Sequence, residues 1–192
     1  MSDVLTPFDD AATAAGVIAA TQRWLEVAVI GLNLCPFAKA VHAKRQIRYA
    51  VTAATTTEEL RAELQHELEL LAGTNPETIE TTLLIHPQAL TDFLGFHLFL
   101  READALIRKL GHEGSLQLAS FHPSYEFADN APDAIENFTN RSPHPMLHLL
   151  REASIERAVA AFPDAATIYE RNIETLRRLG RDGWRQLGID GP

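Results

Sequence analysis

The sequence predicts an α/β (or α+β) fold in which crossover helices connect a small sheet of three to four strands. Three short segments have the alternating or β-branched apolar pattern of strands, and segments with helical apolar spacing separate them. This alternation favours parallel strand pairs whose connecting helices cover the sheet. A long helix precedes the strands and two helices follow them, and the 192 residues are expected to form one domain.

The N-terminal part of the chain is predicted to be helical. Residues 9–34 carry an apolar stripe at three- and four-residue spacing, formed by Val17, Ile18, Trp24, Leu25, Ala28, Val29 and Leu32. Pro36 interrupts this helix, because proline fits best at the first position of a helix and restrains the residue before it. A second, short helix can run from Pro36 to Lys44.

The middle of the chain alternates strands with helices. We predict strands over residues 45–52, 81–86 and 115–121. A stripe of leucines predicts a helix over residues 57–72, between the first two strands. The helix between the last two strands begins at a cap, Thr91 or Asp92, and stops at Gly111.

An irregular stretch of about twenty residues follows the third strand, and a loop of this length is uncommon inside a compact domain. Aromatic residues such as Tyr125 are scattered through it, so we expect an ordered, functional loop. Two helices are predicted after it, over residues 145–162 and 163–179. Residues 1–8 and 180–192 are expected to be frayed tails, and the alternative for the second is that Trp184 and Leu187 dock on the domain.

Composition narrows the classes of function. The net charge is −9, and the longest basic cluster, at residues 43–48, is too short for a phosphate-binding face. No run approaches the roughly eighteen apolar residues of a membrane span, and the acidic N-terminus is unlike a signal peptide. The lone Cys35 suits a reducing compartment. We therefore expect a cytoplasmic protein with no nucleic-acid and no membrane partner.

Two predicted strands end in the same dipeptide, His86-Pro87 and His122-Pro123. In open sheets built from crossover units, ligands gather beyond the carboxyl ends of the strands. His86 and His122 are therefore candidates for one pocket. The alternative is that each pair only ends a strand, because the proline stops the hydrogen-bond ladder.

The irregular loop closes at a predicted helix start near Ser142. Unpaired N–H groups at such a start can hold an anion, and Arg141 could clamp a carboxylate or phosphate with two parallel hydrogen bonds. Arg151 would share a helix face with His148, and His144 and His148 could grip a metal if both lie on that helix. The alternative is that Ser142 is only a cap and Arg141 only solvated.

Cys35 is the remaining reactive candidate. If Pro36 opens a short helix, the thiol lies at the N-cap, where the helix dipole lowers its pKa and favours the nucleophilic thiolate. Its apolar neighbours Leu34 and Phe37 fit an inert core cysteine as well.

Three blocks of the sequence are distinctive together. They are Leu34-Cys35-Pro36-Phe37-Ala38, Phe121-His122-Pro123 with Tyr125 and Phe127, and Asn140-Arg141-Ser142-Pro143 running into Leu147-His148-Leu149-Leu150-Arg151-Glu152. In this combination the chain resembles a bacterial family known as domain of unknown function 1415, and the likeness covers nearly its whole length. The resemblance implies that the three blocks belong together, and it assigns no activity to them.

The favoured hypothesis is an enzyme, a Cys/His-dependent transferase or hydrolase, that acts on a small anionic metabolite. Cys35 would be the nucleophile or a ligand, His122 the general base or acid, and Arg141 the anion clamp. The further substrate contacts would be Tyr125, Asn140, Ser142, His148 and Arg151.

Two alternatives stay open. The first is a site for a divalent transition metal, Zn, Fe or Cu, with ligands drawn from Cys35, His86, His122 and His148. The second is a non-catalytic interaction protein in which the irregular loop is a docking surface.

Overall fold

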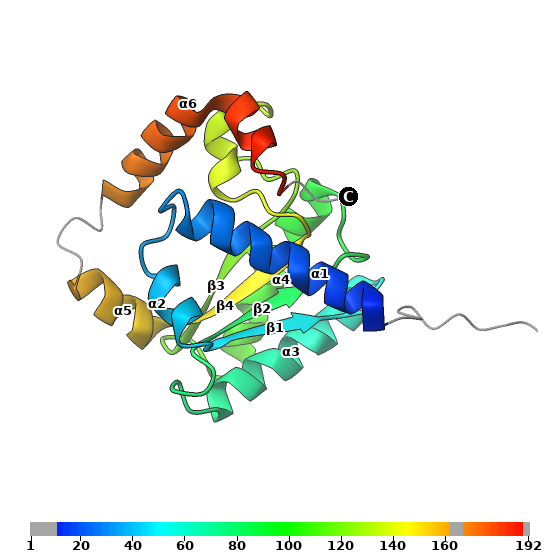
Figure 1. Ribbon diagram of the computed structural model, residues 1–192. Coiled ribbons are helices and arrows are strands. Elements are labelled where there is room, and N and C mark those ends of the chain that lie inside the picture. The colour runs from blue at the N-terminus through cyan, green and yellow to red at the C-terminus, as the bar shows by residue number, and fades with distance from the viewer. Residues whose placement is uncertain (1–10, 162–166, 190–192) are drawn as a thin grey trace, which may run out of the picture.

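A four-stranded mixed sheet forms the centre of the computed structural model, which describes residues 11–161 and 167–189 (Figure 1). The strands are β1 (Ile47–Val51), β2 (Thr81–Ile85), β3 (Leu116–Phe121) and β4 (Met146–Arg151). Their order across the sheet is β1-β2-β4-β3. β1 is parallel to β2, whereas β4 is antiparallel to both β2 and β3. The predicted α/β class is confirmed, and the fourth strand is a late segment inserted between two earlier ones.

Helices connect and flank the strands. They are α1 (Ala11–Trp24), which continues as the π-helical turn η1 (Leu25–Ile30), then α2 (Ala38–Ala43), α3 (Thr57–Gly73), α4 (Phe93–Lys109), the 3-10 helix η2 (Ile135–Thr139), α5 (Glu152–Ala161) and α6 (Ile168–Gln186). The long N-terminal helix and the two C-terminal helices are present, although their bounds differ from the predicted ones. No helix in the described ranges is both long enough and apolar enough to cross a membrane.

Each face of the sheet has its own apolar core. On one face, α3 and α4 bury residues such as Leu64 and Phe96 against Leu84, Leu147 and Leu149 of the strands. On the other face, α1, η1 and α6 cover Leu83, Ile85 and Met146 with Trp24, Leu25, Leu176 and Trp184. Figure 1 shows α1 crossing this second face while α3 lies on the opposite side of the sheet. The sheet is thus the middle of three layers.

Local signals in the sequence fix where the two crossover helices begin. Thr56 accepts a hydrogen bond from Glu59 N (3.2 Å), and the Glu59 carboxylate accepts one from Thr56 N (3.2 Å), which completes a capping box before α3. Asp92 accepts one from Gly95 N (2.7 Å) and so caps α4, as predicted. Two otherwise unpaired helix ends are therefore satisfied by the side chains that precede them.

The prediction of a helix over residues 145–162 is wrong in its first part. Residues Met146–Arg151 form β4, and only Glu152–Ala161 are helical. β4 lies between β2 and β3 and carries apolar side chains on both faces, Met146 toward one core and Leu147 and Leu149 toward the other. Such a short apolar run has no period that separates a buried strand from a buried helix.

The C-terminal tail is not frayed over residues 180–189, where the alternative of a docked Trp184 is the one found. Residues 180–186 continue α6, and Trp184 and Ile189 are buried in the core on the α1 side. The hydrogen bonds of Arg23 to Leu187 O (3.1 Å) and Gly188 O (3.2 Å) tie this segment to α1. Residues 1–8, the other predicted tail, lie outside the described residues.

Candidate functional site

The irregular loop after β3 is organised by the buried amide of Asn137. Its Oδ1 accepts hydrogen bonds from Phe127 N and Asn130 Nδ2 (both 3.1 Å), and its Nδ2 donates to Ala131 O (2.9 Å). This one side chain on η2 therefore satisfies backbone groups of the preceding arm of the loop, at Phe127 and Ala131. Sequence reasoning missed this residue, since an isolated asparagine in a loop carries no periodic signal.

Arg141 is held at the end of this loop. The indole N–H of Trp24 donates to Arg141 O (2.9 Å), which fixes the backbone to α1. The guanidinium carbon lies 4.3 Å from the centre of the Phe138 ring, a cation–π distance, and Nη2 donates to Pro132 O (2.8 Å). The side chain is therefore oriented before any ligand arrives.

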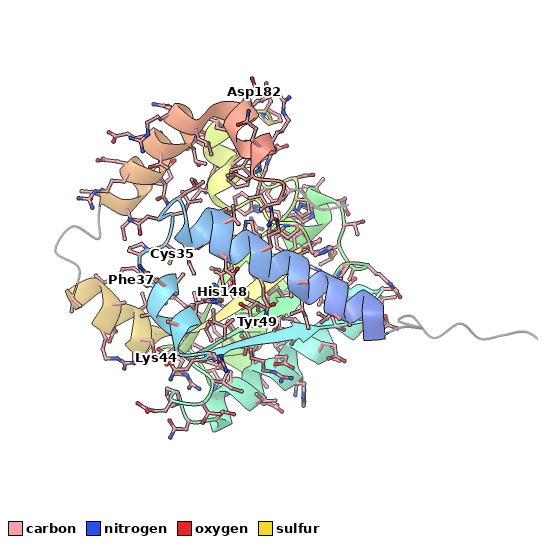
Figure 2. The ribbon with its side chains drawn as sticks, viewed as in Figure 1. Cys35, Phe37, Lys44, Tyr49, His148 and Asp182 are labelled. Carbon is pink, nitrogen blue, oxygen red and sulfur yellow. The ribbon has the colours of Figure 1, made fainter. Side chains whose placement is uncertain are left out.

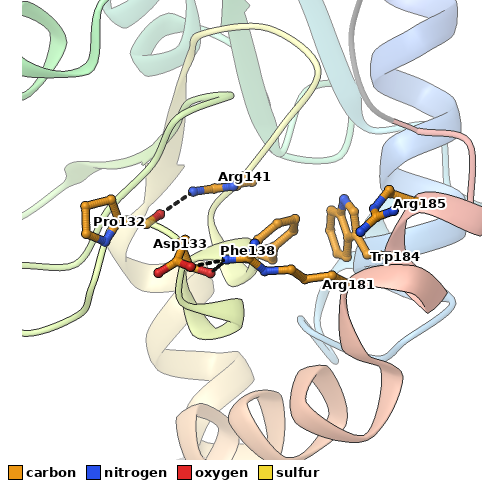
Figure 3. Close-up of a pocket in the computed structure, with 7 residues that line it drawn as sticks. All are labelled: Pro132, Asp133, Phe138, Arg141, Arg181, Trp184 and Arg185. Atoms are coloured by element: carbon orange, nitrogen blue, oxygen red, sulfur yellow. Dashed lines mark hydrogen bonds and ion pairs between the residues drawn. The ribbon is translucent and has the colours of Figure 1, made fainter.

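Arg141 lines a hollow of about 430 Å³ between the loop and α6, shown in Figure 3. We call this the arginine hollow, and its lining residues are Pro132, Asp133, Phe138, Arg141, Arg181, Trp184 and Arg185. Three guanidinium groups thus face one carboxylate. Arg181 forms an ion pair with Asp133 Oδ2 (2.9 Å) and also donates to Asp133 O, while Arg185 contacts Asp182 (3.1 Å).

A kink in α6 creates the far wall of the arginine hollow. Gly180 has φ 66° and ψ 174°, a conformation that is essentially restricted to glycine. The kink redirects the last turns of the helix, so that Trp184 is buried with its ring 5.0 Å from Phe138 in an edge-to-face contact. Sequence reasoning missed Arg181 and Arg185 because residues 180–192 were expected to be a tail.

The two His-Pro pairs do converge at the ends of β2 and β3. The rings of His86 and His122 lie 5.7 and 5.1 Å from that of Phe96 on α4, and both histidines are fully buried. His86 Nδ1 bonds to Ala89 O (2.9 Å), and His122 Nε2 bonds to Leu90 O (3.3 Å). Burial lowers the pKa of His86 to about 4 and lowers that of His122 as well, so both imidazoles are neutral at pH 7.

Cys35 lies elsewhere, on the α1 side of the sheet (Figure 2). The short helix α2 begins at Ala38 with Phe37 as its N-cap, so Cys35 is not at the predicted N-cap position. Backbone hydrogen bonds from Phe37 and Ala38 nevertheless act to lower the thiol pKa. Burial has the larger effect and raises the pKa of the thiol above its ordinary value. The expectation of a favoured thiolate is therefore wrong.

The three residues predicted to be catalytic have separate surroundings. Cys35 packs on the apolar core beneath α1, His122 packs on the rings of α4, and Arg141 packs on Phe138 of the loop. Tyr125 and Asn140 anchor the loop to the neighbouring elements. The Tyr125 ring contacts Phe93 of α4, and Asn140 Nδ2 donates to Ser120 O of β3 (3.1 Å).

The predicted helix start at Ser142 does not exist, because the residues after it lead into β4. Ser142 Oγ donates to His144 O (2.7 Å), so it stabilises a turn rather than a helix. His148 lies on the strand, where its Nε2 is 2.7 Å from Thr81 Oγ1, and burial lowers its pKa to about 4. Arg151 projects from the opposite face and donates to three carbonyl oxygens, those of Leu71, Thr74 and Ile79. The shared helix face of His148 and Arg151 is therefore wrong, as is the helical His144–His148 pair.

Metal binding finds no support in the described residues. Among them, no group of three or more His, Cys, Asp or Glu side chains could hold a metal ion. Cys35 and the partly exposed His148 lie on the α1 side of the sheet, whereas His86 and His122 pack against α4.

A family model described as "protein of unknown function (DUF1415)" matches residues 16–186. The chain belongs to this family. The match spans the loop, Arg141 and all of α6, so both walls of the arginine hollow lie within the DUF1415 region. No curated protein and no solved structure matches the chain.

Proposed function

We propose that this DUF1415 protein binds a small anion, a carboxylate or a phosphate, in the arginine hollow. The observation that carries the proposal is the gathering of Arg141, Arg181 and Arg185 around one cavity. Each guanidinium presents a planar fork of donors that matches a carboxylate or phosphate. A volume of about 430 Å³ suits a small metabolite.

The charge distribution supports this assignment. The whole chain carries a formal charge of −9, yet α6 contains five arginines against three acidic residues, Glu170, Glu174 and Asp182. A local positive region on an acidic protein attracts anions only at short range, because salt screens charges beyond roughly 8–10 Å. The hollow would therefore select its ligand by contact rather than by long-range steering.

The walls of the arginine hollow strengthen its electrostatics. Phe138 and Trp184 form the apolar part of the lining, and apolar walls reduce the screening by water. Asp133 acts in the opposite direction, because its carboxylate occupies Arg181 and competes with an incoming anion. The affinity should thus reflect exchange of one carboxylate partner for another.

The proposal concerns binding, because Asp133 is the one side chain in the lining with the chemistry of a general base, and it is paired with Arg181. The wider hypothesis of a Cys/His-dependent transferase or hydrolase stays a prediction. It requires Cys35 and His122 to act on the same ligand, and neither residue lines the arginine hollow.

Calorimetric titration with phosphate and with citrate at low salt tests the proposal. Arg185→Gln removes one guanidinium whose side chain is largely exposed, and we expect affinity to fall about tenfold, the loss of one charged hydrogen bond. Asp133→Asn removes the competing carboxylate and should raise affinity. Arg178→Gln is the matched control, since Arg178 is an exposed arginine of the same helix outside the lining.

Two results would contradict anion binding in this hollow. One is the absence of heat for either anion with the unmodified protein. The other is an equal loss of affinity in Arg185→Gln and Arg178→Gln, which would show that only the net charge of α6 matters.

A further inference from the structure

The two outer strands of the sheet, β1 and β3, differ in how their free edges are protected (Figure 1). β1 carries the charged residue Arg48, and charged residues on an outer strand discourage pairing with another chain. β3 has the sequence LQLASF, which contains neither a charged residue nor a proline. Gln117 is exposed, and residues 118–121 are partly exposed. The free edge of β3 therefore lacks the residues that commonly keep a sheet edge from pairing.

The hydrogen bonds between β3 and β4 show which backbone groups of β3 point to this edge. In an antiparallel pair, every second pair of opposite residues is hydrogen-bonded. Glu152 N donates to Ser115 O (3.0 Å), and these residues are opposite each other when the register of β3 and β4 is extended by one residue. The odd-numbered residues of β3 therefore bond to β4. The N–H and C=O groups of Leu116, Leu118 and Ser120 point outward.

Two of these outward groups already have partners within the chain. Leu116 N donates to His112 O (2.9 Å) in the turn before the strand, and Ser120 O accepts a hydrogen bond from Asn140 Nδ2 (3.1 Å). The other outward groups are Leu116 O, Leu118 N, Leu118 O and Ser120 N, and none of them has a hydrogen-bond partner among the residues that the structure describes. The free edge thus offers donors at residues 118 and 120 and acceptors at residues 116 and 118.

We infer that the free edge of β3 binds a second copy of this chain, with the two β3 strands antiparallel about a twofold axis at Leu118. In this arrangement the Leu118 residues of the two copies exchange both backbone hydrogen bonds. Ser120 N of each copy donates to Leu116 O of the other, so every free group finds a partner. The two occupied groups, Leu116 N and Ser120 O, face each other across the same pair of residues. The two four-stranded sheets become one continuous sheet.

This self-complementarity favours a second copy over an unrelated extended peptide. Such a peptide supplies an unbroken row of N–H and C=O groups, and those that meet the occupied Leu116 N and Ser120 O would remain unpaired. A copy of β3 has its own occupied groups at these two points. The side chains are compatible as well, because Gln117 lies opposite Ala119 of the partner subunit and no like charges meet. A contact of this isologous kind is typical of twofold homodimers.

Sedimentation equilibrium of the full chain over a range of concentrations tests this inference. We expect a dimer with about twice the 21.2 kDa of one chain. Ser120→Pro removes one outward N–H and keeps the bonds to β4, and an outer strand tolerates proline at such a position. Because each copy loses one hydrogen bond to the other, the dissociation constant should rise about 30-fold. Ser120→Ala is the matched control, since it keeps the N–H and should dimerise as the unmodified protein does.

Disulfide cross-linking tests the register, and it does so whether or not Ser120→Pro folds. Gln117 and Ala119 of the partner subunit form a non-hydrogen-bonded pair in the inferred dimer, and the Cβ atoms of such pairs are about 4.5–5.5 Å apart. In a Cys35→Ser background, chains with Gln117→Cys should therefore cross-link to chains with Ala119→Cys. Either variant alone places its cysteines about 7–8 Å apart, too far for a disulfide, and should cross-link at least about tenfold more slowly.

Three results would overturn the inference. The first is the mass of one chain at every concentration, which would leave the edge to an unrelated extended peptide. The second is equal dimerisation of Ser120→Pro and Ser120→Ala. The third is cross-linking of the mixed cysteine variants that is no faster than that of each variant alone, which would place the dimer contact on another surface.

Discussion

Two histidines with lowered pKa values, His86 and His148, should make this protein markedly less stable in weak acid. Burial lowers the pKa of His86 and of His148 from 6.5 to about 4 each. When the folded pKa lies below the unfolded one, the unfolded chain binds more protons between the two values, so stability is lost as pH falls through this window. At about pH 5 each histidine should cost about 2 kcal/mol relative to neutral pH, and the two together about 4 kcal/mol. That is a large part of the 5–15 kcal/mol that typically stabilises a domain.

Urea unfolding at about pH 5 and pH 7.5 measures this difference, and matched variants assign it. His148→Gln keeps an N–H near Thr81 Oγ1, and His86→Asn keeps one near Ala89 O, so each preserves a hydrogen bond without a titrating group. Each variant should reduce the difference in unfolding free energy between the two pH values by about 2 kcal/mol. His66→Gln, at an exposed position on α3, should leave it unchanged. If His66→Gln and the other two variants behave alike, His86 and His148 do not cause the pH dependence.

Three further substitutions test individual contacts. Arg48→Met leaves the buried Glu67 without its two hydrogen bonds (2.7 and 2.8 Å), and urea unfolding should show a loss of about 3 kcal/mol that Glu67→Leu largely restores in the double variant. Thr56→Ala removes the cap of α3 and should cost about 1 kcal/mol in the same assay. Gly180→Ala meets no atom within 4 Å, so its expected cost of about 1–3 kcal/mol is backbone strain alone. It should also weaken phosphate binding measured by calorimetry, whereas an unchanged affinity would separate the kink from the arginine hollow.

The sequence predicts most elements from their local apolar pattern and fails at β4, a strand that passes directly into a helix. α3 and α4 each bury one side, so their stripes and caps are visible in the sequence. β4 buries both sides and runs directly into α5 at Glu152. Its partners lie far away in the chain, in β2 and β3, and local spacing does not encode such pairings. The helix predicted over residues 145–162 thus merges a strand with the helix that follows it.

The sequence likewise predicts one of the candidate sites and misses the other. The approach of His86 to His122 follows from parallel strands that end at one edge of the sheet, a geometry that the alternating pattern predicts. Arg141 is singled out from the sequence for a helix start that the structure lacks. It lines the arginine hollow because Trp24 fixes its backbone and because Gly180 turns the end of α6 toward it. Both causes depend on contacts between segments that are far apart in the chain, and residue spacing in the sequence does not predict such contacts.

The inserted strand β4 explains why neither of two hollows lies where open parallel sheets usually hold their ligands. The crevice beyond the ends of β2 and β3 is filled by the chain that enters β4, since His86 N donates to Pro145 O (3.0 Å) and His122 N donates to Asn140 O (3.2 Å). The two histidines are consequently buried and neutral, and they hold backbone carbonyls instead of facing a cleft. One hollow lies between the loop and the kinked end of α6, and another lies along the outer strand β1. A search for ligands of this protein should therefore test molecules whose charges complement the residues that line these two hollows, rather than molecules that would bind the histidines at the strand ends.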